Sequence, residues 1–438
     1  MLIRSHAPLR RARRSWALVA ILLHRVLPVV LAATLPAALA AQALGALAAS
    51  DATPFTCLDT ASRVHPARLD DTHLIFVEQQ TVVAQPDGRI LVAGNPIWVW
   101  TDRGTRYDML ANDSLFGMIV DTTAIVHAIP SPLPGHPLDG MRAVALPDGW
   151  WMVTFADVIP AEVPKRPTVL NMWVAETDGA RWRALRKLPV VTDSLDVTMS
   201  TALVWRNGRA RLAMPYAKDH LRRIVLYSLD GGKWTASIQD FGLANVSATA
   251  LHLTATRDVI AVVMPFLDSA YDVNSLFLYT KAPRDARWTG KRTVVRAGQE
   301  PVLDPLFTDF ATPVLSWRKS RNAQRDWDAW ITTYDEQRDS IAPPTLLTTK
   351  AVEIAPASHG DRLAWAISDR AWPGPSVQLL ESDNSVRSAR LSRDTRYRGL
   401  LGLAITRGRA VLIAAQSAAT PREPGVVSMI ETHTWRCR

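Results

Sequence analysis

The side chains best suited to chemistry lie in segments that separate short apolar runs. They combine tryptophan, arginine and tyrosine, and the densest set is Trp317, Arg318, Trp327, Arg396, Tyr397 and Arg398. Guanidinium groups bind carboxylates through paired hydrogen bonds, and aromatic rings offer flat apolar contact area. This set therefore predicts a surface that binds a carbohydrate, an acidic small molecule or a protein partner.

Tyr397 is the candidate nucleophile because an arginine flanks it on each side. A nucleophilic side chain needs a neighbouring acid or base, and Glu300 and Glu353 are the candidate partners. The sequence contains no H-E-x-x-H pair, no phosphate-binding glycine-rich loop and no G-x-S-x-G motif. We therefore expect no metal and no cofactor, and the catalytic set is incomplete.

Short β-strands must position these residues. After residue 50, apolar residues alternate or run in blocks of four to eight, which is typical of an all-β chain. Seven segments resemble "IVLYSLD" and recur about 50 residues apart, a period found in propellers and solenoids. They are "FGMIVDT", "NMWVAET", "RIVLYSL", "SLFLYTK", "DAWITTY", "SVQLLES" and "VVSMIET".

Each segment follows a strand–turn–strand pattern and precedes one more short strand. Asp87-Gly88, Asp148-Gly149 and Asn207-Gly208 predict two-residue hairpin turns. Four strands per unit predict a β-propeller of seven four-stranded blades, with six or eight as alternatives, closed by pairing of the chain ends. The expected domains are a leader over 1–40, a linker containing Cys57 over 41–73 and one propeller over 74–438.

The turn in "YSLDGGKW" resembles the Asp-box (BNR) repeat of sialidases and other secreted propellers. The residues that carry the resemblance are Ser228, Asp230, Gly232 and Trp234, with a second copy at Asp178, Gly179 and Trp182. We expect these residues to be structural: aspartate accepts hydrogen bonds from the turn amides, glycine supplies positive φ, and tryptophan packs under a neighbouring strand. The resemblance also implies a sialidase-like glycoside hydrolase as an alternative activity.

Strand direction in a propeller sorts its loops onto two faces. The second-to-third loops and the links between blades share one face, here called the long-loop face. The first-to-second and third-to-fourth turns share the other, here called the tight-turn face. Because binding residues collect on long loops of a rigid scaffold, we expect the site on the long-loop face.

The N-terminus resembles an export signal. "RRARR" is a basic region, an apolar stretch follows, and "ALA" before "AQ" predicts cleavage after Ala40. The alternative is an uncleaved membrane anchor through residues 16–49, which are apolar enough to span a bilayer. We therefore expect a secreted or periplasmic protein, monomeric, that touches a membrane only through an uncleaved leader.

The two cysteines, Cys57 and Cys437, lie near opposite ends of the exported part of the chain. An even cysteine count in an oxidising compartment favours a disulfide, and ring closure would bring these residues together. The net charge of +9 includes six arginines of the leader, so the remainder carries +3. Nucleic-acid binding is therefore not expected, because it needs a concentrated basic face.

These observations support two hypotheses. The first is an exported propeller that binds a ligand or a partner on its long-loop face without catalysis. The second is a sialidase-like glycoside hydrolase acting on acidic glycans, with Tyr397 as nucleophile.

Overall fold

A computed structural model describes most of the chain between Cys57 and Cys437. The described residues are 57–66, 74–76, 81–94, 96–102, 105–111, 115–123, 126–159, 168–191, 201–218, 221–239, 241, 246, 248–268, 271–285, 287–296, 302–308, 312–321, 327–360, 362–368, 376–381, 386–390, 396–406, 408–419 and 426–437. Within these ranges no helix is long and apolar enough to cross a membrane. The predicted leader and its cleavage site lie outside the described residues.

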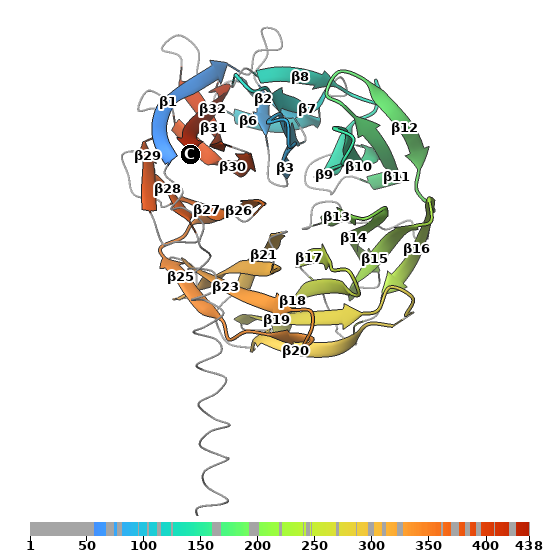
Figure 1. Ribbon diagram of the computed structural model, residues 1–438. Helices are drawn as coiled ribbons and strands as arrows, with labels where there is room; N and C mark the ends of the chain where they lie inside the picture. Colours follow the sequence, from blue (N-terminus) through green and yellow to red (C-terminus); the bar gives the residue numbers. More distant parts are fainter. Residues whose placement is uncertain are drawn as a thin grey trace, which may run out of the picture. The chain divides into compact units, whose positions relative to one another are not determined.

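The described strands form antiparallel sheets arranged as the blades of a propeller (Figure 1). Blade 1 contains β3 (Thr81–Ala84), β4 (Ile90–Ala93), β7 (Leu115–Val120) and β8 (Val126–Pro130). Blade 2 contains β9 (Leu138–Ala145), β10 (Trp151–Ile159), β11 (Thr168–Thr177) and β12 (Trp182–Lys187). Blade 3 contains β13 (Ala202–Arg206), β14 (Arg209–Lys218), β15 (Leu221–Asp230) and β16 (Lys233–Gln239). Blade 4 contains β17 (Ala248–Leu253), β18 (Asp258–Asp268), β19 (Tyr271–Lys281) and β20 (Thr289–Val295).

The remaining sheets complete the ring and add one accessory sheet. Blade 5 contains β21 (Val302–Thr308), β22 (Val314–Ser320), β23 (Trp327–Asp335), β24 (Ser340–Ile341) and β25 (Thr345–Thr349). Blade 6 contains β26 (Glu353–His359), β27 (Arg362–Ser368), β28 (Ser376–Glu381) and β29 (Val386–Arg390). Blade 7 contains β30 (Arg396–Thr406), β31 (Arg409–Ala419), β32 (Val426–Cys437) and β1 (Cys57–Pro66). The accessory sheet contains β2 (Leu74–Phe76), β5 (Pro96–Asp102) and β6 (Thr105–Ala111).

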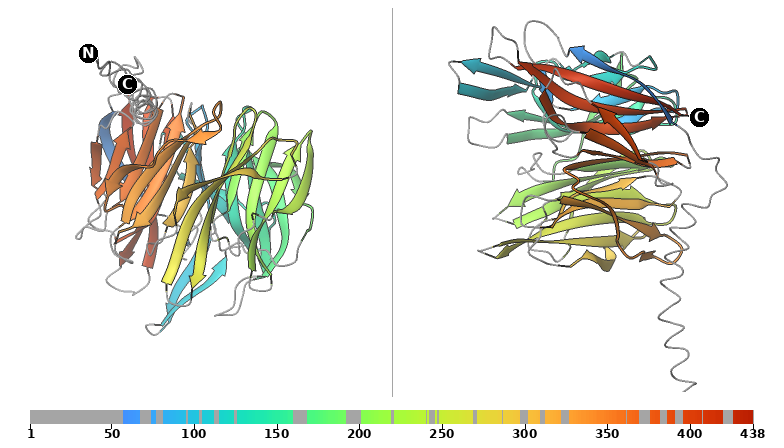
Figure 2. Two further views of the ribbon diagram at one scale, coloured as in Figure 1. Left: turned by 90° about the horizontal axis from the view of Figure 1, so that it is seen from below. Right: turned by 90° about the vertical axis from the view of Figure 1, so that its left-hand side faces the viewer.

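The all-β propeller prediction is confirmed. Of the ring sheets that the described strands form, six have four strands each, as the sequence predicted for a blade. The unit in fifth place departs from that pattern because β23 pairs with both β24 and β25. The first strands of successive units pack side by side around the central channel, and β30 returns to β3 (Figures 1 and 2).

Ring closure differs from the prediction in one respect. The seventh repeated segment was expected to precede one more short strand, but the residues after it, Trp435 to Cys437, are the end of β32, which continues without a turn. The outer strand of blade 7 is instead β1, from the segment expected to be a linker, and the compact unit begins at Phe55. In this pairing Cys57 lies directly opposite Cys437 in the register.

The hairpin turns follow their sequences closely. At Asn207-Gly208 both residues have positive φ, 51° and 76°, as the predicted two-residue turn requires. The two "PDG" turns are different: Gln85 N–H donates to the carbonyl of Arg89, which leaves a three-residue loop, and Leu146 makes the same bond to Trp150. The two-residue prediction is therefore wrong there, because proline fixes φ near −65° and leaves only the glycine positive.

Apolar side chains from adjacent blades pack against one another to form the core. For example, Ile90 and Val92 of blade 1 form one buried cluster with Val411 and Ile413 of blade 7. Side chains alternate between the two faces of a strand, so each blade contributes to the cluster on either side. The ring is thereby held by a series of inter-blade cores.

Arginines near the tight-turn face connect neighbouring blades. Each donates to a backbone carbonyl of the following blade: Arg89 to Asp178 at 2.7 Å, Arg206 to Leu253 at 2.9 Å, Arg362 to Thr406 at 3.1 Å and Arg409 to Thr122 at 2.9 Å. These charge-assisted bonds satisfy carbonyls that the turns leave unpaired. They fix the angle between blades where the apolar cores end.

The second Asp-box-like turn has the predicted geometry. Asp178 Oδ1 accepts from the amides of Ala180 and Arg181, at 2.9 and 2.8 Å. Gly179 has φ of 96°, and a Cβ there would lie 2.7 Å from Ile119. Trp182 donates from Nε1 to the carbonyl of Pro130 in blade 1 at 3.1 Å. Asp178, Gly179 and Trp182 are therefore structural.

The first copy uses its aspartate differently. Gly231 and Gly232 both have positive φ, and the strand pairs Ser228 with Thr235 beside them, while Trp234 packs half-buried on the core between blades 2 and 3. The carboxylate of Asp230 lies 3.1 Å from Arg211 Nη2 and 3.7 Å from Arg209 Nε, so the expectation that it caps its own turn is wrong. With two glycines already setting the turn, the carboxylate is available for an ion pair.

That ion pair belongs to a buried network between blades 3 and 4. Arg211 and Asp258 both have side chains that are 1% exposed, and Arg211 Nε lies 2.9 Å from Asp258 Oδ2. Arg209 also donates to Asp258. Two buried charges in direct contact satisfy one another, and removal of either would leave the other uncompensated.

Candidate functional site

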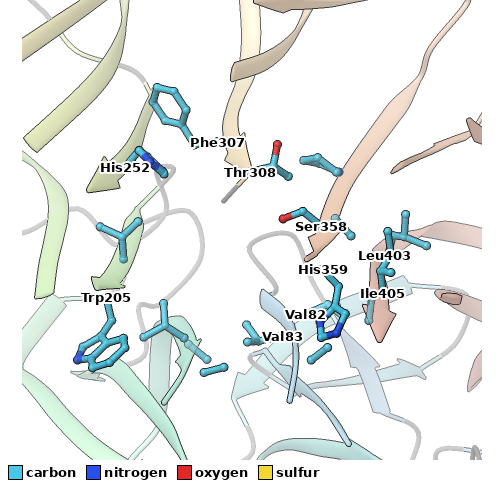
Figure 3. A pocket seen from close by; sticks show the side chains of 18 of the residues that line it. Val82, Val83, Trp205, His252, Phe307, Thr308, Ser358, His359, Leu403 and Ile405 are labelled. Atoms are coloured by element: carbon cyan, nitrogen blue, oxygen red, sulfur yellow. The ribbon is translucent and has the colours of Figure 1, made fainter. Parts of the chain in front are cut away.

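A cavity of about 460 Å³ occupies the central channel (Figure 3). Its walls come from the first strand of every blade: β3, β9, β13, β17, β21, β26 and β30. In each strand the lining residues lie near the carboxyl end, as with Trp205 in β13 and His359 in β26. Because these ends lead into the first hairpin turns, the cavity opens toward the tight-turn face.

Most of the wall is apolar, and valine, alanine, leucine and isoleucine side chains line blades 1, 2 and 7. The polar and aromatic lining residues come from blades 3 to 6; they are Arg206, His252, Thr308, Ser358, His359, Trp205 and Phe307. Figure 3 shows His359 beside Val82 of blade 1. The described lining contains no aspartate or glutamate. An apolar cavity with a few converging polar groups is the usual form of a small-molecule site.

Packing fixes several of these groups in place. The rings of His252 and Phe307 lie 5.6 Å apart, and His252 is 4% exposed. Thr308 donates from Oγ1 to the carbonyl of Val314 at 3.2 Å, and Arg206 donates to Leu253 as described above. These groups are therefore preorganised across the seams between blades 3, 4 and 5.

One half-buried arginine, Arg142, lies next to the cavity wall. Arg142 precedes the lining residue Ala143 and donates from Nε to the carbonyl of Thr201 at 3.0 Å. Desolvation by burial lowers the pKa of Arg142 to about 10, against an opposing attraction from Asp139. The guanidinium therefore remains charged at neutral pH.

The predicted binding residues of blade 5 separate into two groups. Trp317 is 1% exposed and belongs to the core between blades 4 and 5, so its prediction as a surface binding residue is wrong. Because side chains alternate between the two faces of β22, the Trp317 ring points into the interface between the blades. Arg318 and Trp327 are half-buried at the long-loop end of the blade, and the guanidinium carbon of Arg318 lies 5.4 Å from the centre of the Trp327 ring.

The predicted binding residues of blade 7 belong to strand β30. Arg396, Tyr397 and Arg398 are at the start of that strand, where Tyr397 pairs with Gln416. The cavity residue Leu403 lies six residues further along, which at about 3.3 Å per residue is roughly 20 Å away. Tyr397 is therefore at the other end of the channel from the cavity.

Of the two candidate acids, only Glu353 lies within the described residues. Glu353 starts β26 and accepts a hydrogen bond from Ser368 at 2.7 Å within its own blade. Glu300 lies outside the described residues. The pairing of Tyr397 with an acidic partner therefore stays a prediction.

The sequence analysis missed a polar group at the long-loop end of blade 2. Asp157 is 3% exposed, and its Oδ2 accepts from Asn171 at 3.1 Å and lies 4.0 Å from His136 Nδ1. Its Oδ1 has no hydrogen-bond partner. The signal was an aspartate inside an otherwise apolar run, "WWMVTFADVI", and buried carboxylates normally need partners.

The described residues contain no cluster of three or more histidine, cysteine or acidic side chains that could hold a metal ion. Hydrolysis of glycosides generally needs a pair of carboxyl groups flanking the bond. The described cavity wall supplies no such pair.

No protein-family model and no curated protein sequence matches the chain. Similar solved structures include a protein of unknown function from Dyadobacter fermentans DSM 18053, at 11% identity over 69% of this chain and 95% of that one, with a TM-score of 0.49. An α-L-arabinofuranosidase from Fusarium graminearum matches at 10% identity over 67% and 92%, with a TM-score of 0.43. A xylan β-1,4-xylosidase from Bacillus halodurans C-125 matches at 9% identity over 84% and 99%, with a TM-score of 0.36. Sequence identities and TM-scores this low do not indicate a shared activity. The class, a β-propeller with a closed ring and a central cavity, rests on the strand topology of the chain itself.

Proposed function

We propose that this protein is an exported, non-catalytic propeller that binds a small molecule in its central channel. The observation that supports this most directly is the cavity of about 460 Å³, lined by the first strand of every blade. Its volume falls in the usual range of small-molecule sites, and a few polar groups line a mostly apolar wall. The proposal moves the site from the long-loop face, where the sequence placed it, to the tight-turn end of the channel.

The competing proposal is a sialidase-like glycoside hydrolase that acts through Tyr397 on the long-loop face. It requires an acidic partner for Tyr397, and the candidate Glu353 accepts a hydrogen bond from Ser368. Purified protein should therefore show no turnover of a panel of fluorogenic glycosides that includes a sialoside. Turnover that disappears in Tyr397→Phe would establish the hydrolase instead.

The channel proposal is tested by filling the cavity. Ala145 lines it at the end of β9, and Ala145→Phe should occupy part of its volume. A matched control is Ala180→Phe, which adds the same bulk to an exposed turn of the same blade. Ligand-observed NMR with a fragment library should give hits whose signals are lost with Ala145→Phe and kept with Ala180→Phe. Hits that ignore Ala145→Phe would place binding elsewhere.

A further inference from the structure

The inner edges of the blades bring main-chain hydrogen-bonding groups to the cavity. The first strand of each blade is the terminal strand of its sheet, paired with the second strand on one side, and its other edge faces the channel (Figure 1). In an antiparallel pair, hydrogen-bonded residues alternate with residues whose N–H and C=O both point away from the partner strand. Every second residue of a first strand therefore directs a donor and an acceptor toward the channel.

The hairpin turns show which residues these are. Leu146 N–H donates to the carbonyl of Trp150, so the adjacent pair, Ala145 with Trp151, is a non-hydrogen-bonded pair whose main-chain groups face outward from the sheet. Counting from the turn in the same way assigns one residue in each of four other blades: Ala84, Trp205, Leu253 and Ile405. All five residues line the cavity and are here called the main-chain ring.

Two observations agree with this assignment. The carbonyl of Leu253 accepts a hydrogen bond from Arg206 Nη1 of the preceding blade at 2.9 Å, as expected of a carbonyl that points away from its own second strand. In blade 6 the same alternation places Pro356 with its nitrogen toward the channel. Proline has no N–H and is confined within sheets to positions that need no ladder bond. The inner edge therefore accepts proline at one such position.

A ring of main-chain groups favours neither sign of charge. Each residue offers a donor beside an acceptor, so a ligand carboxylate would meet carbonyl oxygens and a ligand ammonium would meet N–H groups. The Arg206 guanidinium is already bonded to Leu253, and the described lining contains no carboxylate. Hydroxyl groups both donate and accept, and therefore match such a wall. The small side chains of Ala84 and Ala145 leave the main chain open to a ligand.

We propose that the channel binds uncharged compounds rich in hydroxyl groups, and that the main-chain ring supplies their hydrogen bonds. This inference rests on the proposed channel function and specifies its ligand class. A polar group that leaves water loses free energy unless the cavity replaces its hydrogen bonds, and a charged group loses far more. The ring replaces hydrogen bonds, but it supplies no counter-charge.

Neutral and charged forms of one sugar test the ligand class. Glucose, galactose and mannose are each compared with the corresponding uronate and 6-amino-6-deoxy sugar, by ligand-observed NMR titration of the full chain at pH 7. At least one neutral sugar should bind, and both of its charged forms should bind about tenfold more weakly or worse. Cyclohexylmethanol, which has a single hydroxyl on a ring of the same size, should also bind about tenfold more weakly. His359→Gln should leave this order unchanged, because the selection uses no charged side chain.

Proline variants test the role of the main chain. Ala145→Pro removes an N–H that faces the channel and no ladder bond, so it should weaken the neutral sugar about fivefold, the contribution of one neutral hydrogen bond. Ala145→Val is the matched control, because it adds similar bulk and keeps the N–H, and it should retain the affinity. Ala84→Pro and Ala84→Val repeat the comparison in blade 1. The Tm of each variant shows whether it has folded.

Several outcomes would overturn the inference. Charged forms that bind as tightly as the neutral sugar, or no binding by any of the three neutral sugars, would reject the ligand class. Equal losses with proline and valine at both positions would show that bulk, and not the main-chain N–H, controls binding. Charged or apolar fragments whose binding is abolished by Ala145→Phe would reject the ligand class and keep the channel as the site. Sugar binding that survives Ala145→Phe would reject the channel itself.

Discussion

The buried pair Arg211–Asp258 gives the sharpest stability prediction. Both side chains are 1% exposed, and they join blade 3 to blade 4 at 2.9 Å. Asp258→Ala leaves the Arg211 guanidinium buried with only Asp230 as a carboxylate partner, and Asp230 is 53% exposed. Breaking a buried pair by removing one partner costs about 3–5 kcal/mol.

The expected loss of unfolding free energy can be converted to a change in Tm, because the unfolding entropy scales with the number of residues in the compact unit. The compact unit, Phe55–Arg438, has about 380 residues, and unfolding entropy near 2.1 cal/mol/K per residue gives roughly 0.8 kcal/mol/K. A loss of about 4 kcal/mol therefore lowers Tm by about 5 °C. Differential scanning calorimetry at one scan rate would measure it, because a large ring need not unfold reversibly.

The double variant Arg211→Met/Asp258→Leu tests the reasoning behind that number. It removes both charges, so its Tm should lie above that of Asp258→Ala, since apolar replacements of buried pairs are often neutral. Asp230→Ala should cost less than Asp258→Ala because Arg211 keeps its buried partner. A double variant that melts below both single variants would refute the claim that an uncompensated charge is the cause.

Three further predictions concern the chain ends and the acid response. Under non-reducing conditions, mass spectrometry should find the peptides of Cys57 and Cys437 joined, with chain entropy giving a stabilisation of at most about 6 kcal/mol; two free thiols in exported protein would contradict this. N-terminal sequencing from the native host should give a start just after Ala40, whereas an intact leader in the membrane fraction would establish the anchor. The hydrogen bond from Arg183 lowers the pKa of Asp148 below 3.8, so the folded state gains stability above the unfolded-state pKa and loses it as pH falls through the folded one. Asp148→Asn should therefore reduce the loss of Tm between pH 5 and about pH 3, and an unchanged slope would show that the pair contributes nothing.

The fold was largely predictable because the sequence contains a recognisable repeat. The third strand of each blade matches a segment that recurs about 50 residues apart, so alignment of the repeats located the blades. Turn residues were less reliable guides. Asp87-Gly88 follows a proline that excludes the two-residue turn, a local restriction that the dipeptide alone does not reveal.

The candidate site was less predictable for two physical reasons. Trp317 looks like a loop residue from its neighbours, yet strand alternation places its ring in the core between blades. The cavity residues come from seven strands far apart in sequence, and they meet only because the ring brings their carboxyl ends together. Superposing the repeats by register would have revealed that Trp205, His252 and Phe307 all lie just before the first turn of their blade.

The pairing of β1 with β32 sets an order of events during synthesis. β1 leaves the ribosome before any other strand of the ring, and its partner is the last strand to be made. The roughly 360 residues between Pro66 and Val426 take about 20 to 70 seconds to translate at ordinary rates. Throughout that interval the hydrogen-bonding edge of β1 has no native partner, and unpaired edges promote aggregation. Truncation within β32 would remove native partners of β1 and leave the outer edge of blade 7 incomplete.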